Sequence, residues 1–156
     1  MTTAPAGTGR TSTVSVQRTI VVDKPINIVF GYLADFTTTT EWDPGTVRTE
    51  RQSGRGGIGT AYLNRSRFLG RTVQLTYIVE EFVDEQLFRL RAIHNTLTAV
   101  DTMTFRTNAG GTEVSYTAQF SFTGPIRLFT PMLKPAFERL ATRAEFGMRA
   151  ALDRLD

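Results

Sequence analysis

The C-terminal part of the chain carries the longest periodic pattern of apolar residues. Taking Leu133 as the origin, apolar and small side chains recur at helical spacing along one stripe: Phe129, Phe137, Leu140, Ala144, Gly147, Met148, Ala151 and Leu155. Charged residues fill the rest of the circumference, so the pattern predicts one amphipathic helix that lies on an apolar surface. Pro131 and Pro135 fall inside this segment, and a proline within a helix costs about 3 kcal/mol. We therefore expect a short turn, then a long helix that is capped by Thr130 and bends near Pro135.

The N-terminal part of the chain predicts a strand followed by two short helices. Apolar residues alternate with polar ones in the first strand, at Val14, Val16, Ile20 and Val22. Arg18 has the same parity, so it is expected to be buried unless a bulge turns it outward. The period then becomes helical over residues 26–36, and residues 37–45 predict a second short helix or a turn that ends at Pro-Gly.

A period of two continues from there to residue 122 and predicts an antiparallel meander. Turn residues divide this region at 53–57, 69–70, 83–86, 95–96 and 108–112. When the residues that flank each turn are paired, the apolar side chains of all strands fall on the same face of the sheet. A slip of one residue in any pair would move the apolar side chains of that strand to the opposite face. The fold class is therefore α+β, with a curved antiparallel sheet and one long helix across its inner face. On the outer face, this register places Glu80 opposite Arg89.

Polar side chains interrupt the inner face of the predicted sheet. By parity they are Tyr62, Asn64, Ser66, Tyr77, His94, Asp101 and Tyr116. Such groups cost a few kcal/mol each when buried without a partner. The register places Asp101 between Leu90 and Ala118, where the small alanine leaves room beside the carboxyl. Its partner is left open between His94, Arg18 and a hydroxyl of a ligand.

Composition narrows the classes of function. The 156 residues are 40% hydrophobic, include no cysteine and include one histidine, so we expect one domain over residues 13–156, no metal and no cofactor. Residues 1–12 are small and polar and predict a disordered N-terminal tail. No signal peptide or membrane-spanning run is recognisable, so a cytoplasmic protein without integral membrane association is expected. The net charge is +3, but arginines are scattered among acidic residues, so no nucleic-acid partner is expected.

Several short motifs give the chain a family resemblance. In order they are Val22, Pro25, Val29-Phe30, Tyr32-Leu33, Asp35-Phe36, Glu41-Trp42, Pro44, Gly57 to Gly59, Gly110-Gly111-Thr112, Gly124-Pro125 and the terminal amphipathic helix. This pattern resembles the polyketide cyclase/dehydrase and lipid-transport family, which belongs to the START and birch-allergen-like superfamily. The resemblance implies the helix-grip fold: a curved seven-stranded antiparallel sheet wrapped around a long C-terminal helix, with two short helices between strands 1 and 2. It also implies a ligand cavity between sheet and helix.

The predicted function is the binding or carrying of a small hydrophobic, lipid- or polyketide-like ligand in that cavity. The break before the long helix is its expected mouth. The candidate ligand-binding residues are Trp42, Tyr62, Asn64, Tyr77, Leu90, His94, Asp101, Tyr116, Phe120, Leu133 and Phe137.

Two alternative functions remain open. In the first, the protein is a polyketide cyclase/dehydratase that resembles the aromatase branch of the family. Asp101 and His94 are then the acid/base candidates, Tyr77 and Tyr116 are the candidates for polarising a carbonyl, and no residue is assigned as catalytic. In the second, it is an oligomeric interaction module. Phe146 falls on the charged side of the helix together with Leu128, which predicts either a homodimer contact or a cover from residues 36–42.

Overall fold

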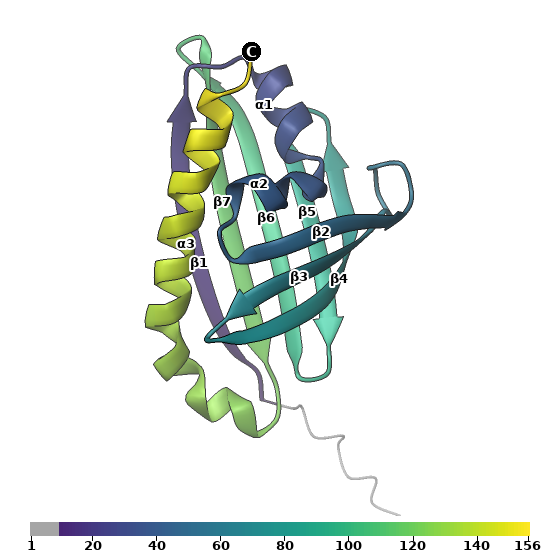
Figure 1. The fold of residues 1–156 in the computed structure, drawn as a ribbon, viewed down its shortest axis with the longest axis vertical. Coiled ribbons are helices and arrows are strands. Elements are labelled where there is room, and N and C mark those ends of the chain that lie inside the picture. The colour runs from purple at the N-terminus through teal and green to yellow at the C-terminus, as the bar shows by residue number, and fades with distance from the viewer. Residues whose placement is uncertain (1–9) are drawn as a thin grey trace, which may run out of the picture.

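Seven antiparallel strands form one curved sheet in the order β1-β7-β6-β5-β4-β3-β2 (Figure 1). The computed structural model describes residues 10–156, so most of the predicted N-terminal tail lies outside the described residues. The strands are β1 (Ser12–Val22), β2 (Thr46–Ser53), β3 (Ala61–Phe68), β4 (Arg71–Val83), β5 (Leu87–His94), β6 (Leu97–Asn108) and β7 (Gly111–Phe122). The meander and its inner face are therefore confirmed.

The sheet bends because its ladders contain register shifts. The β2–β3 pair shifts between Thr46 and Arg48 and again near Ser53, and the β4–β5 pair shifts between Val79 and Glu81. An extra residue on one strand kinks it and increases its twist. As a result β2, β3 and β4 cross obliquely in front of the other strands (Figure 1).

The same shift corrects one predicted ion pair. Without a bulge, Glu80 would face Arg89. The structure pairs Glu81 with Arg89 across the ladder, and Glu80 forms its ion pair with Arg91 instead, at 2.5 Å. The bulge moves each acidic residue by one position relative to β5, which strict alternation could not reveal.

The β3–β4 hairpin is closed by two residues, Leu69 and Gly70. Both have positive φ, 50° and 76°, which matches the right-handed twist of the strands that they connect. Such a conformation is costly for leucine. Leu69 is nevertheless held there at the tip of the hairpin, with its side chain exposed.

Two short helices lie between β1 and β2, as predicted. α1 (Ile26–Leu33) buries Val29, Phe30 and Leu33 against the sheet. A short 3₁₀ turn, η1 (Phe36–Thr38), leads into α2 (Thr39–Trp42), and the side chain of Asp35 caps this turn by accepting a hydrogen bond from the backbone N–H of Thr37.

The long C-terminal helix is confirmed, and its start differs from the prediction. A 3₁₀ helix, η2 (Pro125–Phe129), comes first, and α3 (Thr130–Asp153) follows with Pro131 in its first turn and Pro135 inside it. Thr130 does not act as the cap, because it lies within the helix and its buried hydroxyl makes no hydrogen bond among the described residues. Phe129 is exposed rather than on the inner stripe, since the 3₁₀ turn rotates it away from the helical spacing.

Arg18 remains on the inner side of β1 without a bulge. The β1–β7 ladder is continuous from Ser12 to Val22, so the side chain points toward α3. There it forms ion pairs with Glu138 at 2.8 Å and Glu145 at 3.4 Å, two turns apart on the helix. These acidic residues satisfy a cation that would otherwise be poorly solvated.

The inner face of the sheet contains two apolar clusters. The larger one surrounds Phe30, whose ring meets Phe82 and Phe105 edge-on with centroids 5.3 and 5.0 Å away, and it takes in Met148 and Leu152 of α3. The smaller cluster surrounds Phe137 and includes Val14, Val16, Ala118 and Phe122. Between them the helix does not close onto the sheet.

Candidate ligand-binding site

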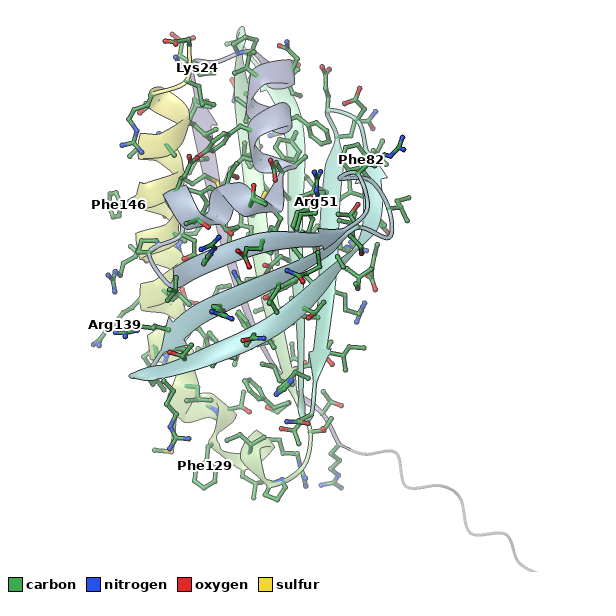
Figure 2. The ribbon with its side chains drawn as sticks, turned by 45° about the vertical axis from the view of Figure 1, so that its right-hand side comes forward. Lys24, Arg51, Phe82, Phe129, Arg139 and Phe146 are labelled. Carbon is green, nitrogen blue, oxygen red and sulfur yellow. The ribbon has the colours of Figure 1, made fainter. Side chains whose placement is uncertain are left out.

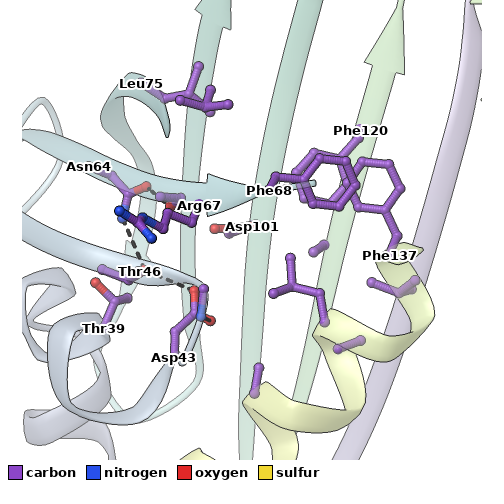
Figure 3. A pocket seen from close by; sticks show the side chains of 18 of the residues that line it. Thr39, Asp43, Thr46, Asn64, Arg67, Phe68, Leu75, Asp101, Phe120 and Phe137 are labelled. Carbon is purple, nitrogen blue, oxygen red and sulfur yellow. Dashed lines mark hydrogen bonds between the residues drawn. The ribbon is translucent and has the colours of Figure 1, made fainter. Parts of the chain in front are cut away.

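A cavity of about 380 Å³ lies between the inner face of the sheet and the N-terminal half of α3 (Figure 3). Leu133, Phe137, Leu140 and Ala144 line it from the helix. Opposite them, the lining is mainly apolar and includes Val16, Val73, Leu75, Leu97, Ala118 and Phe122. Such a concave, largely apolar space with few polar groups has the composition of a small-molecule site.

Three stacked aromatic rings form one side of the cavity. Phe137 lies between Phe68 and Phe120, with ring centroids 4.5 and 4.4 Å away and interplanar angles of 18° and 20°. The stack joins β3, α3 and β7, which are distant in the sequence. It holds the tip of the β3–β4 hairpin against the helix while leaving the space beside it open.

Asp101 is the central polar residue of the cavity. It lies on β6 between Leu90 and Ala118, as the predicted register requires, and Tyr116 donates a hydrogen bond to its carboxyl. Burial and the negative charge of Asp43 raise the pKa of Asp101 to about 7, and the bond from Tyr116 opposes this rise. The carboxyl therefore exchanges a proton near neutral pH.

Asp43 is a second carboxyl in the lining, and it comes from the loop between α2 and β2. It accepts hydrogen bonds from the backbone N–H of Gly45 and from the hydroxyl of Thr46, both at 2.9 Å. Burial raises its pKa, while these two bonds and the charge of Arg143 oppose the rise. Because Asp43 has more donors than Asp101, we assign the charge to Asp43 and the proton to Asp101.

Two tyrosines and the single tryptophan complete this end of the cavity. Burial raises the pKa of both Tyr77 and Tyr116 well above the ordinary value, so both remain neutral phenols. The hydroxyl of Tyr77 has no hydrogen-bond partner within residues 10–156 and is available to a ligand. Trp42 donates its indole N–H to Thr38 at 3.3 Å, and its ring meets Tyr116 edge-on.

Asn64 lines the cavity, but its side-chain amide already forms hydrogen bonds with neighbouring side chains. Its amide donates to Thr49 at 2.8 Å and to Thr46 at 3.3 Å, and its carbonyl oxygen accepts from Ser66 at 2.6 Å. Thr46 also bonds Asp43 (Figure 3). Asn64 therefore positions the polar loop that carries Asp43 and does not offer free donors to a ligand.

Three predicted site residues lie away from the cavity. Tyr62 is buried behind its wall, with its ring against Phe36, and Leu90 is fully buried between neighbouring strands. His94 has the predicted parity but is exposed at the end of β5, where it contacts Asn95 at 3.1 Å. Its placement in the cavity was wrong, because β5 extends beyond the part of the sheet that α3 covers. Neither His94 nor Arg18 is the partner of Asp101.

The other predicted residues do line the cavity: Trp42, Asn64, Tyr77, Asp101, Tyr116, Phe120, Leu133 and Phe137. The most important omission is Asp43, which resembles an ordinary turn residue before Pro-Gly. Phe68 could have been found, because it continues the inward parity of Tyr62, Asn64 and Ser66 up to the turn.

Two kinds of feature are absent from the described residues. Within residues 10–156, no three histidine, cysteine or acidic side chains lie close enough together to hold a metal ion. No helix in the same range has the length and apolar character needed to cross a membrane.

Comparison with known proteins agrees with this architecture. The family model described as "Polyketide cyclase / dehydrase and lipid transport" matches residues 13–156. No curated protein matches the chain.

Solved structures match the fold at low sequence identity. The protein TTHA0849 from Thermus thermophilus has a TM-score of 0.76 and 16% identity, with 89% of this chain and 97% of that chain covered. The Zhui aromatase/cyclase from Streptomyces sp. R1128 has a TM-score of 0.75 and 16% identity, with 91% and 94% covered. A START superfamily protein from Mycobacterium smegmatis has a TM-score of 0.75 and 10% identity, with 90% and 97% covered. At these identities the likeness shows a common fold.

Proposed function

Because the chain belongs to the polyketide cyclase/dehydrase and lipid-transport family, we propose that it binds a small hydrophobic, lipid- or polyketide-like molecule. The observation that carries this proposal is the cavity of about 380 Å³ beneath the N-terminal half of α3. Its volume falls within the range of about 300–1,000 Å³ that is usual for small-molecule sites.

The arrangement of polar groups supports one orientation of the ligand. Asp101, Tyr116 and Tyr77 stand at the inner end. Most of the remaining lining is apolar, apart from the polar loop around Asp43 and Asn64 and the two arginines, Arg67 and Arg71. A ligand with one polar terminus would place that terminus among these three groups, where protonated Asp101 and the Tyr77 hydroxyl donate hydrogen bonds. Its apolar part would lie along Phe120, Phe137 and Leu133.

A dye titration with a blocked cavity tests the proposal. We expect the neutral apolar dye Nile red to bind wild-type protein with one saturable site. Ala118→Phe places a ring in the space beside Asp101 and should weaken binding at least tenfold. The matched control is Gln119→Phe, which adds the same ring on the exposed outer face of the neighbouring position. Equal binding by wild type and folded Ala118→Phe, judged by near-ultraviolet circular dichroism, would refute a site in this cavity.

The pair of carboxyls favours a second candidate function, that of a cyclase/dehydratase. In a dehydration, the Asp43 carboxylate would remove the proton next to a substrate carbonyl, and Asp101 would protonate the departing hydroxyl, which leaves as water. The proton on Asp43 then returns to Asp101 through solvent. The products are an enone and one water molecule, and the two carboxyls end as they began.

A chromogenic β-hydroxy ketone distinguishes this candidate from simple binding. Dehydration of 4-hydroxy-4-phenylbutan-2-one gives a conjugated enone that absorbs in the near ultraviolet. An enzyme should form it catalytically and lose turnover in Asp101→Asn while still binding Nile red. No turnover by wild-type protein that binds the dye supports the binding function instead.

A further inference from the structure

Exposed apolar side chains gather next to the opening of the cavity. Among residues 10–156, four of the twelve large hydrophobic residues with high exposure lie within seven positions: Ile126 (39%), Leu128 (70%), Phe129 (54%) and Met132 (75%). Leu69 at the tip of the β3–β4 hairpin is a fifth, at 65%. Leu69 and Ile126 also line the cavity, so the group surrounds its mouth. Phe129 points away from the body of the protein at this end (Figure 2).

The two segments that carry these apolar residues contain basic side chains and no acidic ones. Residues 61–79 and 123–137, which contain the hairpin and the start of α3, include no aspartate or glutamate. Arg67 and Arg71 line the cavity beside Leu69, and Arg127 and Lys134 lie in the same stretch of sequence as the other apolar residues. Within the described part of the chain, none of these four forms an ion pair. In contrast, Arg89 and Arg91 on the outer face of the sheet are paired with Glu81 and Glu80.

We propose that this apolar and basic rim docks the protein on the surface of an anionic lipid membrane, with the cavity mouth facing the lipids. The rim comprises Arg67, Leu69, Arg71, Ile126, Arg127, Leu128, Phe129, Met132 and Lys134. Exposed Leu, Phe and Met side chains enter the boundary between headgroups and acyl chains, while arginine and lysine contact lipid phosphates. Contacts of this kind are typical of peripheral binding at the membrane surface.

A membrane fits this rim better than an acidic protein does. A flat acidic partner would engage the cations but would leave Leu128 and Met132 in water, whereas a lipid surface accommodates both kinds of side chain. Such docking would also let an apolar ligand pass between bilayer and cavity without crossing water. This passage of a ligand rests on the proposed function, whereas docking on the membrane does not.

Vesicle sedimentation tests the docking surface. Vesicles of phosphatidylcholine with about 30% phosphatidylserine should sediment the full-length protein, and pure phosphatidylcholine vesicles should do so weakly. The double variant Phe129→Ser/Met132→Ser should bind at least tenfold more weakly. Arg127→Gln/Lys134→Gln should lose about fivefold per charge, and raising the salt concentration should weaken wild-type binding in the same direction.

The matched control is Phe146→Ser/Ile58→Ser, which removes two side chains of similar exposure, 70% and 71%, away from the rim. Phe146 stands on the outer side of α3, far from Phe129 in the view of Figure 2. This control should sediment like wild type. If the control and the rim variant lose binding equally, or if wild type does not bind anionic vesicles, the proposal is overturned.

The remaining outcomes separate this inference from the proposed function. Nile red titration of Phe129→Ser/Met132→Ser in solution should match wild type, because neither residue lines the cavity. Vesicle binding without dye binding would retain the docking surface and reject the ligand site. If the rim instead pairs two copies of the chain, wild type should sediment as a dimer that the rim variant converts to a monomer, and the membrane assignment would fail.

Discussion

The two halves of α3 meet the sheet differently. In the C-terminal half, Met148 and Leu152 are buried in the cluster around Phe30 and do not line the cavity. In the N-terminal half, Leu133 and Leu140 face a cavity. One continuous apolar stripe on a helix can therefore form a solid core at one end and a binding wall at the other.

Close backbone approach explains why the C-terminal half is closed. A Cβ atom at Gly147 would come within 2.0 Å of the carbonyl oxygen of Trp42, so only glycine allows α2 to lie against the helix there. The N-terminal half is held away from the sheet by the stacked rings of Phe68, Phe137 and Phe120. A glycine therefore allows close packing of α3 at its C-terminal end, and large aromatic rings keep α3 and the sheet apart at its N-terminal end.

The largest expected effect comes from the same substitution made in each half. Leu152→Ala should reduce the free energy of unfolding by about 3 kcal/mol, because it leaves a void in a filled cluster. Leu133→Ala should cost about 1 kcal/mol or less, since its side chain already borders open space. Urea denaturation of both variants measures the difference. Equal losses would mean that the two halves are packed alike.

The second prediction concerns the cavity beneath the N-terminal half of α3: the titration of Asp101 should make the unfolding free energy depend on pH. Its pKa of about 7 lies above the unfolded value of 3.8, so the folded protein binds this proton more tightly than the unfolded chain does. The stability of the wild type should therefore fall as pH rises from about 4 to 7, and the full penalty remains above pH 7. Asp43, Tyr116 and Tyr77 are the titratable groups around it.

Asp101→Asn removes that titration and should flatten the pH profile. Relative to wild type, the variant should gain about 2 kcal/mol in unfolding free energy between about pH 4 and pH 8, less than the full shift implies because the cavity admits water. Urea denaturation across this range is the measurement. Parallel profiles for the two proteins would contradict a buried, proton-binding Asp101.

A smaller change in stability is expected from a substitution at Gly147. Gly147→Ala should cost about 1–2 kcal/mol, because the strain against Trp42 exceeds the gain in helix propensity. Gly31→Ala in α1 is the control, since no atom beyond its chain neighbours and its own helix backbone lies within 4 Å of the Cβ position, and it should stabilise by about 0.5–1 kcal/mol. Stabilisation by both alanines would show that α2 does not hold the helix in place.

The smallest expected effect concerns the outer side of α3. Phe146 is exposed, and residues 36–42 do not cover it, because α2 meets the helix at Gly147. Phe146→Ser should change stability by less than about 0.5 kcal/mol. Sedimentation equilibrium tests the homodimer that the sequence left open: a dimer held by this contact would dissociate in the variant, and an unchanged mass would remove that alternative.

The sequence predicted the register of the sheet well, because one buried face constrains every strand. The position of Asp101 between Leu90 and Ala118 followed from alternation alone and is confirmed. Strict alternation does not allow for the bulge at Glu80, which adds one residue to β4 and shifts its pairing with β5. Alternation also could not show how far along β5 the helix α3 covers the sheet, and for this reason the predicted cavity included His94.

The remaining features of the candidate site depend on packing between elements that are distant in the sequence. Asp43 reaches the cavity because a short loop after α2 turns toward β6, and no local pattern distinguishes this residue from an ordinary turn aspartate. The sequence predicted a cavity through the family resemblance and the mixed inner face. Its extent depends on the bend of β2, β3 and β4 and on three rings from three separate elements.

Trp42 is the only tryptophan in the chain, and it belongs to the cavity wall beside Tyr116. All tryptophan fluorescence of this protein therefore originates at the site. Emission wavelength, quenching and lifetime report on the occupancy of that site directly, with no label attached and no background from elsewhere in the fold.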